Sequence, residues 1–302
     1  MPTVTLARLA MATRFELVLH GANPHSLRAA GEEALDEIER IERCLSLYRP
    51  DSQIARVNAR AAHESVPVSP ELFALLQQAR QLSDETGGAF DPTIGPLMRC
   101  WGFVGGTGQL PDPAAVDRCL ALTGMSRVWL DAATRSVRFE RDGMMLDLGA
   151  LGKGYGVQMA AGILRETGVQ SALIHGGTST VYALGAPPDA PSWRVALQTH
   201  PLPPPPAAQA PEPFETVSLC DESLSVSAVW GKSFQAGGKT YGHVLDPRTG
   251  WPVAGAEFAA VILPSAIETD AFSTALLVLG VSGLEGLRGR RPGMRTHLVG
   301  GG

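Results

Sequence analysis

The stretch LDLGALGKGYGVQ, residues 146–158, joins an apolar run to an amphipathic helix through a glycine-rich turn. We expect residues 144–148 to form a strand that carries Asp147 into the turn. The spacing predicts a helix from Gly156 to about Thr167, where a glycine follows. The centre of the chain is therefore expected to be a strand–turn–helix unit.

Two interpretations of the glycine-rich turn stay open on the residues alone. Backbone N–H groups at a helix start, together with the Lys153 ammonium, would suit a bound phosphate. The sequence is not a Walker A motif, which requires Ser or Thr where Gly154 stands. A tight turn that needs glycine for positive φ would explain the same residues.

Upstream of this unit, helices and strands follow one another without regular alternation. Apolar residues recur at helical spacing over 27–45 and again over 70–86. Short runs at 15–20, 127–131 and 136–140 alternate as strands do.

Downstream, the chain is expected to be rich in strands, with one closing helix from about Asp270. The expected strands are 171–175, 181–185, 193–198, 215–219, 223–227, 241–246 and 258–263. This mixture favours an α+β fold with mixed, mostly antiparallel sheets and packed helices. We expect a single domain over 1–302, which could be divided into two lobes, with a proline-rich loop insertion at about 201–215.

The composition excludes several kinds of partner. The 302 residues carry a formal net charge of −5, with 44% hydrophobic and 18% charged residues. No basic field is available to attract nucleic acid. No apolar run approaches the ~20 residues that cross a bilayer, so we expect no membrane span. The N-terminus resembles neither an export signal nor a lipid-attachment site, which predicts a cytoplasmic location, or a periplasmic one if a signal had been removed.

Asp270 and Thr274 stand four residues apart at the expected start of the closing helix. At this spacing a carboxylate and a hydroxyl lie on one helix face, within reach of one cation. Oxygen ligands suit Mg²⁺. Asp at a helix start is also a common cap, so a purely structural role stays open.

Three other segments combine turn residues with groups that could contact a ligand. His243 precedes the turn DPRTG and could act as a general base or be structural. The loop 86–96 contains Phe90 and Asp91, and the loop 47–52 contains Tyr48. A packed turn is the alternative for each loop.

Taken in order, these motifs resemble the ApbE family of flavin transferases. The resemblance covers nearly the whole chain, and its most specific motifs are AFDPTIGPL (89–97), DLGALGKGY (147–155) and HVLDPRTG (243–250). It implies an ApbE-like fold and the transfer of FMN from FAD to an acceptor protein.

The resemblance also implies roles for individual residues. The positions that match FAD contacts are Met11, Tyr48, Ala89, Phe90, Asp91, Asp147, Lys153 and Leu245. The positions that match Mg²⁺ ligands are the Ala150 carbonyl, Asp270, Ser273 and Thr274. His243 matches the histidine that assists proton removal, and we therefore expect His243 and Asp270 to be catalytic.

The implied reaction needs Mg²⁺, FAD as substrate and a protein acceptor. A Ser or Thr hydroxyl of the acceptor, in a short Ser/Thr-Gly-Ala-Thr/Ser motif, would attack the phosphorus on the flavin side, and AMP would leave. Two alternatives remain: a pyrophosphatase that hydrolyses FAD to FMN and AMP, and a non-catalytic flavin-binding or storage protein.

Two positions depart from the family's pattern. Thr178 follows Gly176-Gly177, where relatives usually carry Asp or Asn, and Ala228 replaces a common glycine after Ser227. These departures bear on the shape of the flavin pocket or of the acceptor groove.

Overall fold

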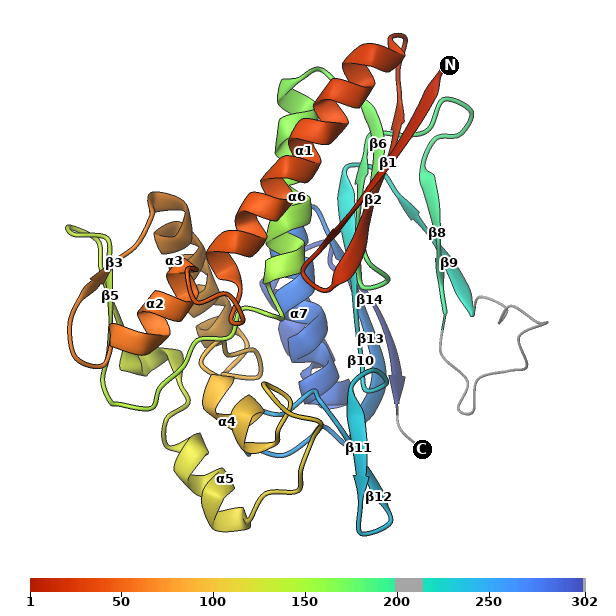
Figure 1. Cartoon of the computed structure of the whole chain (residues 1–302). Helices are drawn as coiled ribbons and strands as arrows, with labels where there is room; N and C mark the ends of the chain where they lie inside the picture. Colours follow the sequence, from red (N-terminus) through yellow and green to blue (C-terminus); the bar gives the residue numbers. More distant parts are fainter. Residues whose placement is uncertain (199–213, 301–302) are drawn as a thin grey trace.

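A seven-stranded antiparallel sheet forms the centre of the molecule (Figure 1). The computed structural model describes residues 1–198 and 214–300. In spatial order the strands are β1 (Thr3–Ala10), β2 (Thr13–His20), β6 (Ser171–Gly176), β7 (Thr180–Leu184), β10 (Glu222–Ala228), β13 (Ala256–Leu263) and β14 (Arg295–Gly300). Each neighbouring pair is antiparallel, in agreement with the predicted α+β class.

Helices cover one face of this sheet. The helices α1 (Pro24–Leu45) and α6 (Gly152–Glu166) lie side by side and bury Leu17, Ile174 and Tyr182 of the sheet (Figure 1). Next to them, α7 (Ala266–Leu279) packs on β10 and β13. Because α7 is enclosed by α6 and the sheet, most of its side chains are buried.

A hairpin covers the opposite face. It consists of β8 (Trp193–Leu197) and β9 (Glu215–Leu219), which pair antiparallel with each other. Strand side chains alternate between the two faces of a sheet. Val181, Leu224 and Phe258 therefore point away from the helices and pack against this hairpin.

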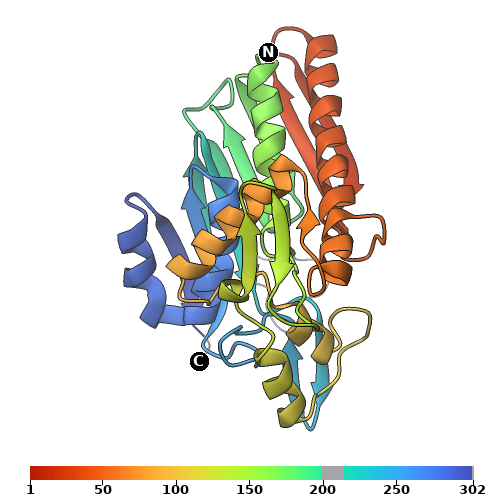
Figure 2. The same cartoon turned by 90° about the vertical axis from the view of Figure 1, so that its left-hand side faces the viewer.

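A second region of smaller elements faces the viewer in Figure 2. Its helical elements are α2 (Gln53–Arg60), α3 (Pro70–Glu85), α4 (Gly95–Cys100), α5 (Pro113–Leu120) and a 3-10 turn (Met125–Arg127). A three-stranded sheet has the spatial order β3 (Val66–Pro67), β5 (Ser136–Phe139), β4 (Val128–Asp131). A separate hairpin consists of β11 (Ser233–Ala236) and β12 (Lys239–Gly242). One buried cluster extends from Leu76 in α3 to Phe272 in α7, so the two regions share a core. A single domain with two lobes remains our prediction.

The expected strand at 144–148 is wrong. The segment pairs with no strand. Leu146 exchanges two hydrogen bonds with the Asn58 side chain, and the Asp147 N–H donates to the Pro92 carbonyl. A side chain and a loop replace the neighbouring strand. The expected strand 241–246 also ends early, at Gly242.

Both helices near the site begin earlier than expected. The helix α6 begins at Gly152 rather than Gly156, and α7 begins at Ala266, so Asp270 is inside the helix instead of opening it. The hydroxyl of Ser265 caps α7 by accepting from the Glu268 N–H. The Ser-x-x-Glu pattern is a capping signal that the sequence analysis missed.

The expected closing helix is not the last element. A 3-10 turn (Gly280–Gly283), α8 (Leu284–Arg290) and β14 follow it. One helical segment, Ala266–Arg290, has the length and apolar composition to cross a membrane, and 61% of its apolar 18-residue window is buried within the protein. Such a buried segment is weak evidence for a membrane span.

No prediction was made for β1, α2, β3, α4, α5 and β11, which are short or lie near a chain end. The proline-rich insertion at about 201–215 lies almost entirely outside the described residues.

Candidate active site

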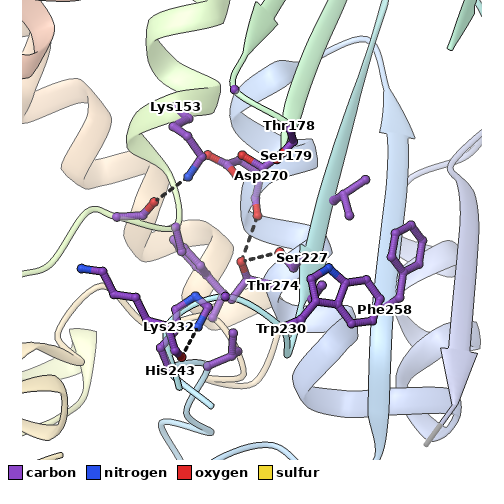
Figure 3. Close-up of a pocket in the computed structure, with 18 of the residues that line it drawn as sticks. Lys153, Thr178, Ser179, Ser227, Trp230, Lys232, His243, Phe258, Asp270 and Thr274 are labelled. Carbon is purple, nitrogen blue, oxygen red and sulfur yellow. Dashed lines mark hydrogen bonds between the residues drawn. The ribbon is translucent and has the colours of Figure 1, made fainter. Parts of the chain in front are cut away.

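One pocket of about 750 Å³ lies where α6, α7, the end of β10 and the loops of the smaller region meet (Figure 3). It collects residues that are far apart in the sequence, from Ala89 to Thr274. A volume of this size is typical of sites for small molecules and cofactors.

A close contact between α6 and α7 fixes the carboxylate of Asp270. The Gly154 N–H donates to Asp270 Oδ2 at 2.8 Å. A Cβ on Gly154 would lie 2.2 Å from the Ala266 carbonyl oxygen, so only glycine lets the helices approach this closely. Gly154 does not have positive φ, and the tight-turn interpretation of this glycine is therefore wrong.

Asp270 is 4% exposed, and burial raises the pKa of its carboxyl group, although Lys153 and the Gly154 N–H oppose this shift. Within 1–198 and 214–300, no Lys, Arg or His lies within ion-pair distance of it. A buried carboxylate without an ion-pair partner is costly unless a cation joins it.

Hydroxyl groups hold α7 against β10 beside this carboxylate. The Thr274 hydroxyl donates to the Asp270 carbonyl oxygen at 3.2 Å, and Ser273 does the same at 3.0 Å. The Ser227 hydroxyl of β10 lies 2.9 Å from the Ser273 hydroxyl and 3.1 Å from that of Thr274. Because the Thr274 hydrogen points to a carbonyl, its oxygen keeps a lone pair for another partner.

Lys153 places its ammonium in the same pocket, 3.5 Å from the Gly149 carbonyl oxygen. Asp147 accepts from the Gly149 N–H at 2.8 Å, and burial raises the pKa of its carboxyl group. Asp91 accepts from Thr93, Ser83 and the Met125 N–H, so its carboxylate also organises the surrounding loops.

His243 is oriented by the backbone of Lys232. Its ring Nδ1 lies 3.1 Å from the Lys232 carbonyl oxygen. A carbonyl only accepts hydrogen bonds, so Nδ1 carries the hydrogen and Nε2 of the neutral ring is free to accept a proton. Burial lowers the pKa of the imidazole below its usual 6.5, which favours this neutral form.

The opposite side of the pocket is apolar, and we call it the apolar half. It is lined by Val195, Leu197, Val226, Trp230 and Phe258. The rings of Trp230 and Phe258 stack with centroids 6.0 Å apart. In Figure 3, Asp270 and Thr274 lie between these two rings and the group formed by Lys153, Lys232 and His243.

The pocket brings together most of the predicted site residues. Those that line it are Ala89, Phe90, Asp91, Asp147, Ala150, Lys153, His243, Leu245, Asp270 and Thr274. Met11, Tyr48 and Ser273 are not among its lining residues. Tyr48 is 68% exposed, Met11 packs near Gly156, and Ser273 is buried behind Thr274. The roles of all these residues remain predictions.

Sequence reasoning missed the apolar half and Lys232. The side chains of the apolar half are ordinary apolar residues of strands, and no local signal separates them from the core. Thr178 and Ala228, the two positions that depart from the family's pattern, also line the pocket.

The fold and the pocket define an α+β protein whose pocket places carboxylate and hydroxyl oxygen atoms and a lysine beside an apolar surface. The model of the ApbE family matches residues 11–297. The chain belongs to the ApbE family, as the resemblance predicted, and it is an enzyme of the transferase class.

Named relatives and solved structures agree with this assignment. A Klebsiella pneumoniae protein named FAD:protein FMN transferase is 35% identical over 257 residues, which cover 84% of this chain and 77% of that protein. A Treponema pallidum protein of the same name is 30% identical, with 91% and 78% covered. The ApbE protein of Thermotoga maritima superposes with a TM-score of 0.88 at 25% identity, over 99% of this chain and 94% of that one. The Pseudomonas stutzeri flavinyl transferase ApbE superposes with a TM-score of 0.85 at 28% identity, over 100% of this chain and 92% of that one.

Proposed function

We propose that this protein transfers FMN from FAD to a Ser or Thr hydroxyl of an acceptor protein and releases AMP. The arrangement of His243, Lys153 and Asp270 around one pocket carries the proposal. The names of the relatives support the flavin-transfer part of it.

The residues around Asp270 fit a Mg²⁺ ion. The Asp270 carboxylate, the Thr274 hydroxyl and Ala150 line one pocket, and the first two offer oxygen atoms. Such donors suit a hard cation that completes its shell with water and phosphate oxygens. The described residues contain no group of three His, Cys, Asp or Glu side chains that could hold a metal ion, so Mg²⁺ here would depend on hydroxyl, water and phosphate oxygens besides Asp270. When bound, Mg²⁺ would neutralise charge on the diphosphate.

The side chains supply the remaining parts of a phosphoryl transfer. Lys153 would contact a diphosphate oxygen and reduce the repulsion met by the incoming hydroxyl. Nε2 of His243 would accept the hydroxyl proton as the new P–O bond forms and the bond to AMP breaks. The partial burial of His243 lowers the pKa of its ring, which favours the neutral form that a proton acceptor needs.

The test uses the whole protein with FAD, Mg²⁺ and a synthetic peptide that contains Ser-Gly-Ala-Thr. We expect a fluorescent peptide that carries FMN, formed together with AMP, and neither product when a chelator removes Mg²⁺. AMP without labelled peptide would replace the proposal by FAD hydrolysis. Tight FAD binding without AMP would replace it by flavin storage.

A further inference from the structure

We propose that the apolar half of the pocket holds an extended segment of the acceptor polypeptide, next to the hydroxyl that attacks FAD. The proposal rests on the transfer function proposed above. It assigns an occupant to residues that neither the predicted FAD contacts nor the predicted Mg²⁺ ligands include.

The position of this surface supports an acceptor site. The predicted FAD contacts that line the pocket, such as Phe90, Asp147 and Lys153, lie on α6 and on loops of the smaller region. The apolar half comes from β8, β10, β13 and, at Trp230, the loop that follows β10. In Figure 3, Thr274 lies between the rings of Trp230 and Phe258 on one side and Lys232 and His243 on the other, with Asp270 next to it. A phosphate and an attacking hydroxyl would meet at this place.

The chemistry of the lining favours a neutral polypeptide segment. No described Asp, Glu, Lys or Arg of β8, β10, β13 or the β6–β7 turn lines the pocket. The nearest cation along the chain, Lys232, follows Trp230 by two residues and lies beside His243 in Figure 3. Trp230 and Val195 instead offer flat, half-buried apolar surface, which binds small side chains and excludes water.

The backbone of β8 adds a second recognition element. Side chains alternate along a strand, yet three consecutive residues, Val195, Ala196 and Leu197, all line the pocket. The strand edge itself therefore reaches the cavity. Among the described residues, β9 is the only strand paired with β8. An extended peptide could form main-chain hydrogen bonds along the other edge.

The two departures from the family's pattern fall on this same side. Thr178 belongs to the β6–β7 turn, and Ala228 ends β10. Their side chains alter the surface that the acceptor would contact and leave Lys153 and Asp270 in place.

Two substitutions test the proposal. Trp230→Ala removes the largest apolar surface, and Ala196→Trp places a bulky ring on an exposed position of β8 without disturbing the core. The matched control is Trp129→Ala, which removes a 52% exposed tryptophan from β4, outside the pocket. Each protein is assayed with the Ser-Gly-Ala-Thr peptide for its KM, and without peptide for FAD affinity by flavin fluorescence. Trp230→Phe keeps an aromatic ring and tests whether such a ring restores the KM for the peptide.

We expect the KM for the peptide to rise about tenfold in Trp230→Ala and Ala196→Trp, while FAD affinity changes less than about twofold. Trp230→Phe should recover most of the loss, and Trp129→Ala should match the wild type. A parallel loss of FAD affinity would assign the apolar half to the flavin and overturn the inference. So would an unchanged KM in both variants, with the proposed function left intact. A wild-type protein that never labels the peptide would overturn both the proposed function and this inference.

Discussion

The two faces of β10 pack against their neighbours through different interactions. Towards α7 the strand presents Ser223, Ser225 and Ser227, whose hydroxyls bond to Thr269, Ser273 and Thr274 at 2.9 to 3.1 Å. Towards the β8–β9 hairpin it presents Leu224, Val226 and Ala228, which pack without directional bonds. Hydrogen bonds depend steeply on distance and angle, whereas apolar burial depends mainly on area.

This difference matches what each side has to do. The hydroxyl bonds fix the register of α7, and with it the positions of Asp270 and Thr274 relative to α6. The proposed metal site would need that precision. The apolar side needs only a surface of suitable shape, so it tolerates a change of side chain more easily.

The largest effect should come from removing charge on the polar side. Asp270→Asn keeps an oxygen for the Gly154 N–H but loses the negative charge, and we expect AMP release to fall about 1,000-fold or more. Without Mg²⁺ the variant should be at least as stable as the wild type, because a buried, unpaired charge is gone. Asp142→Asn, at an exposed carboxylate, is the control. Normal AMP release from Asp270→Asn would move the metal site elsewhere.

The second effect concerns the group that would accept the proton. His243→Ala should lower peptide labelling about 100-fold while FAD affinity stays near the wild-type value. In the wild type, labelling should rise with pH through a midpoint below 6.5, because burial lowers the pKa of the imidazole and only the neutral ring accepts a proton. His63→Ala changes an exposed ring as a control. An acid limb that persists unchanged in His243→Ala would assign the titration to another group.

The third prediction concerns a substitution that affects only the packing between the apolar face of β10 and the β8–β9 hairpin. Leu219 of β9 is fully buried against the sheet and does not line the pocket. Leu219→Ala should lower the free energy of unfolding by about 2–5 kcal/mol, measured by denaturant titration. AMP release per folded molecule should stay near the wild-type value. A loss of release comparable to that of Asp270→Asn would mean that the two faces are coupled.

A smaller effect should follow from breaking one polar bond. Ser227→Ala removes the partner of Ser273 and Thr274, and we expect a loss of about 1–2 kcal/mol of stability with weaker Mg²⁺ dependence of AMP release. Ser218→Ala, at an exposed serine of β9, should change neither. Equal behaviour of the two variants would show that the hydroxyl bonds do not position α7.

The smallest effect concerns the pH dependence of folding stability in the absence of Mg²⁺. Burial raises the pKa of Asp270 in the folded protein above the usual 3.8, so the folded state binds the proton more tightly than the unfolded state. This contribution is fully present below pH 3.8 and is lost as the pH rises through the folded pKa. The unfolding temperature should fall less with rising pH in Asp270→Asn than in the wild type over that range. An identical fall in both proteins would assign the effect to other carboxylates.

Local patterns predicted the longer elements well and the boundaries near the site less well. The helix expected over 27–45 is α1, and that expected from Pro70 is α3, because their apolar periodicity is long and each begins at a proline that follows a capping residue. The strand expected at 144–148 failed because its apolar residues are buried without a strand partner. The start of α6 was missed because its glycines resemble a turn.

The sequence by itself determined the α+β class, the family, and the order of the motifs that contain Asp147, Lys153, His243 and Asp270. These depend on local periodicity and on residue identity, which the chain carries along its length. Only the tertiary structure decided that Asp270 is inside α7 and receives the Gly154 N–H. It also decided that an apolar surface from β8, β10, β13 and the loop after β10 adjoins this carboxylate. Such contacts join segments up to 116 residues apart, and their geometry depends on how helices and strands pack rather than on any local signal.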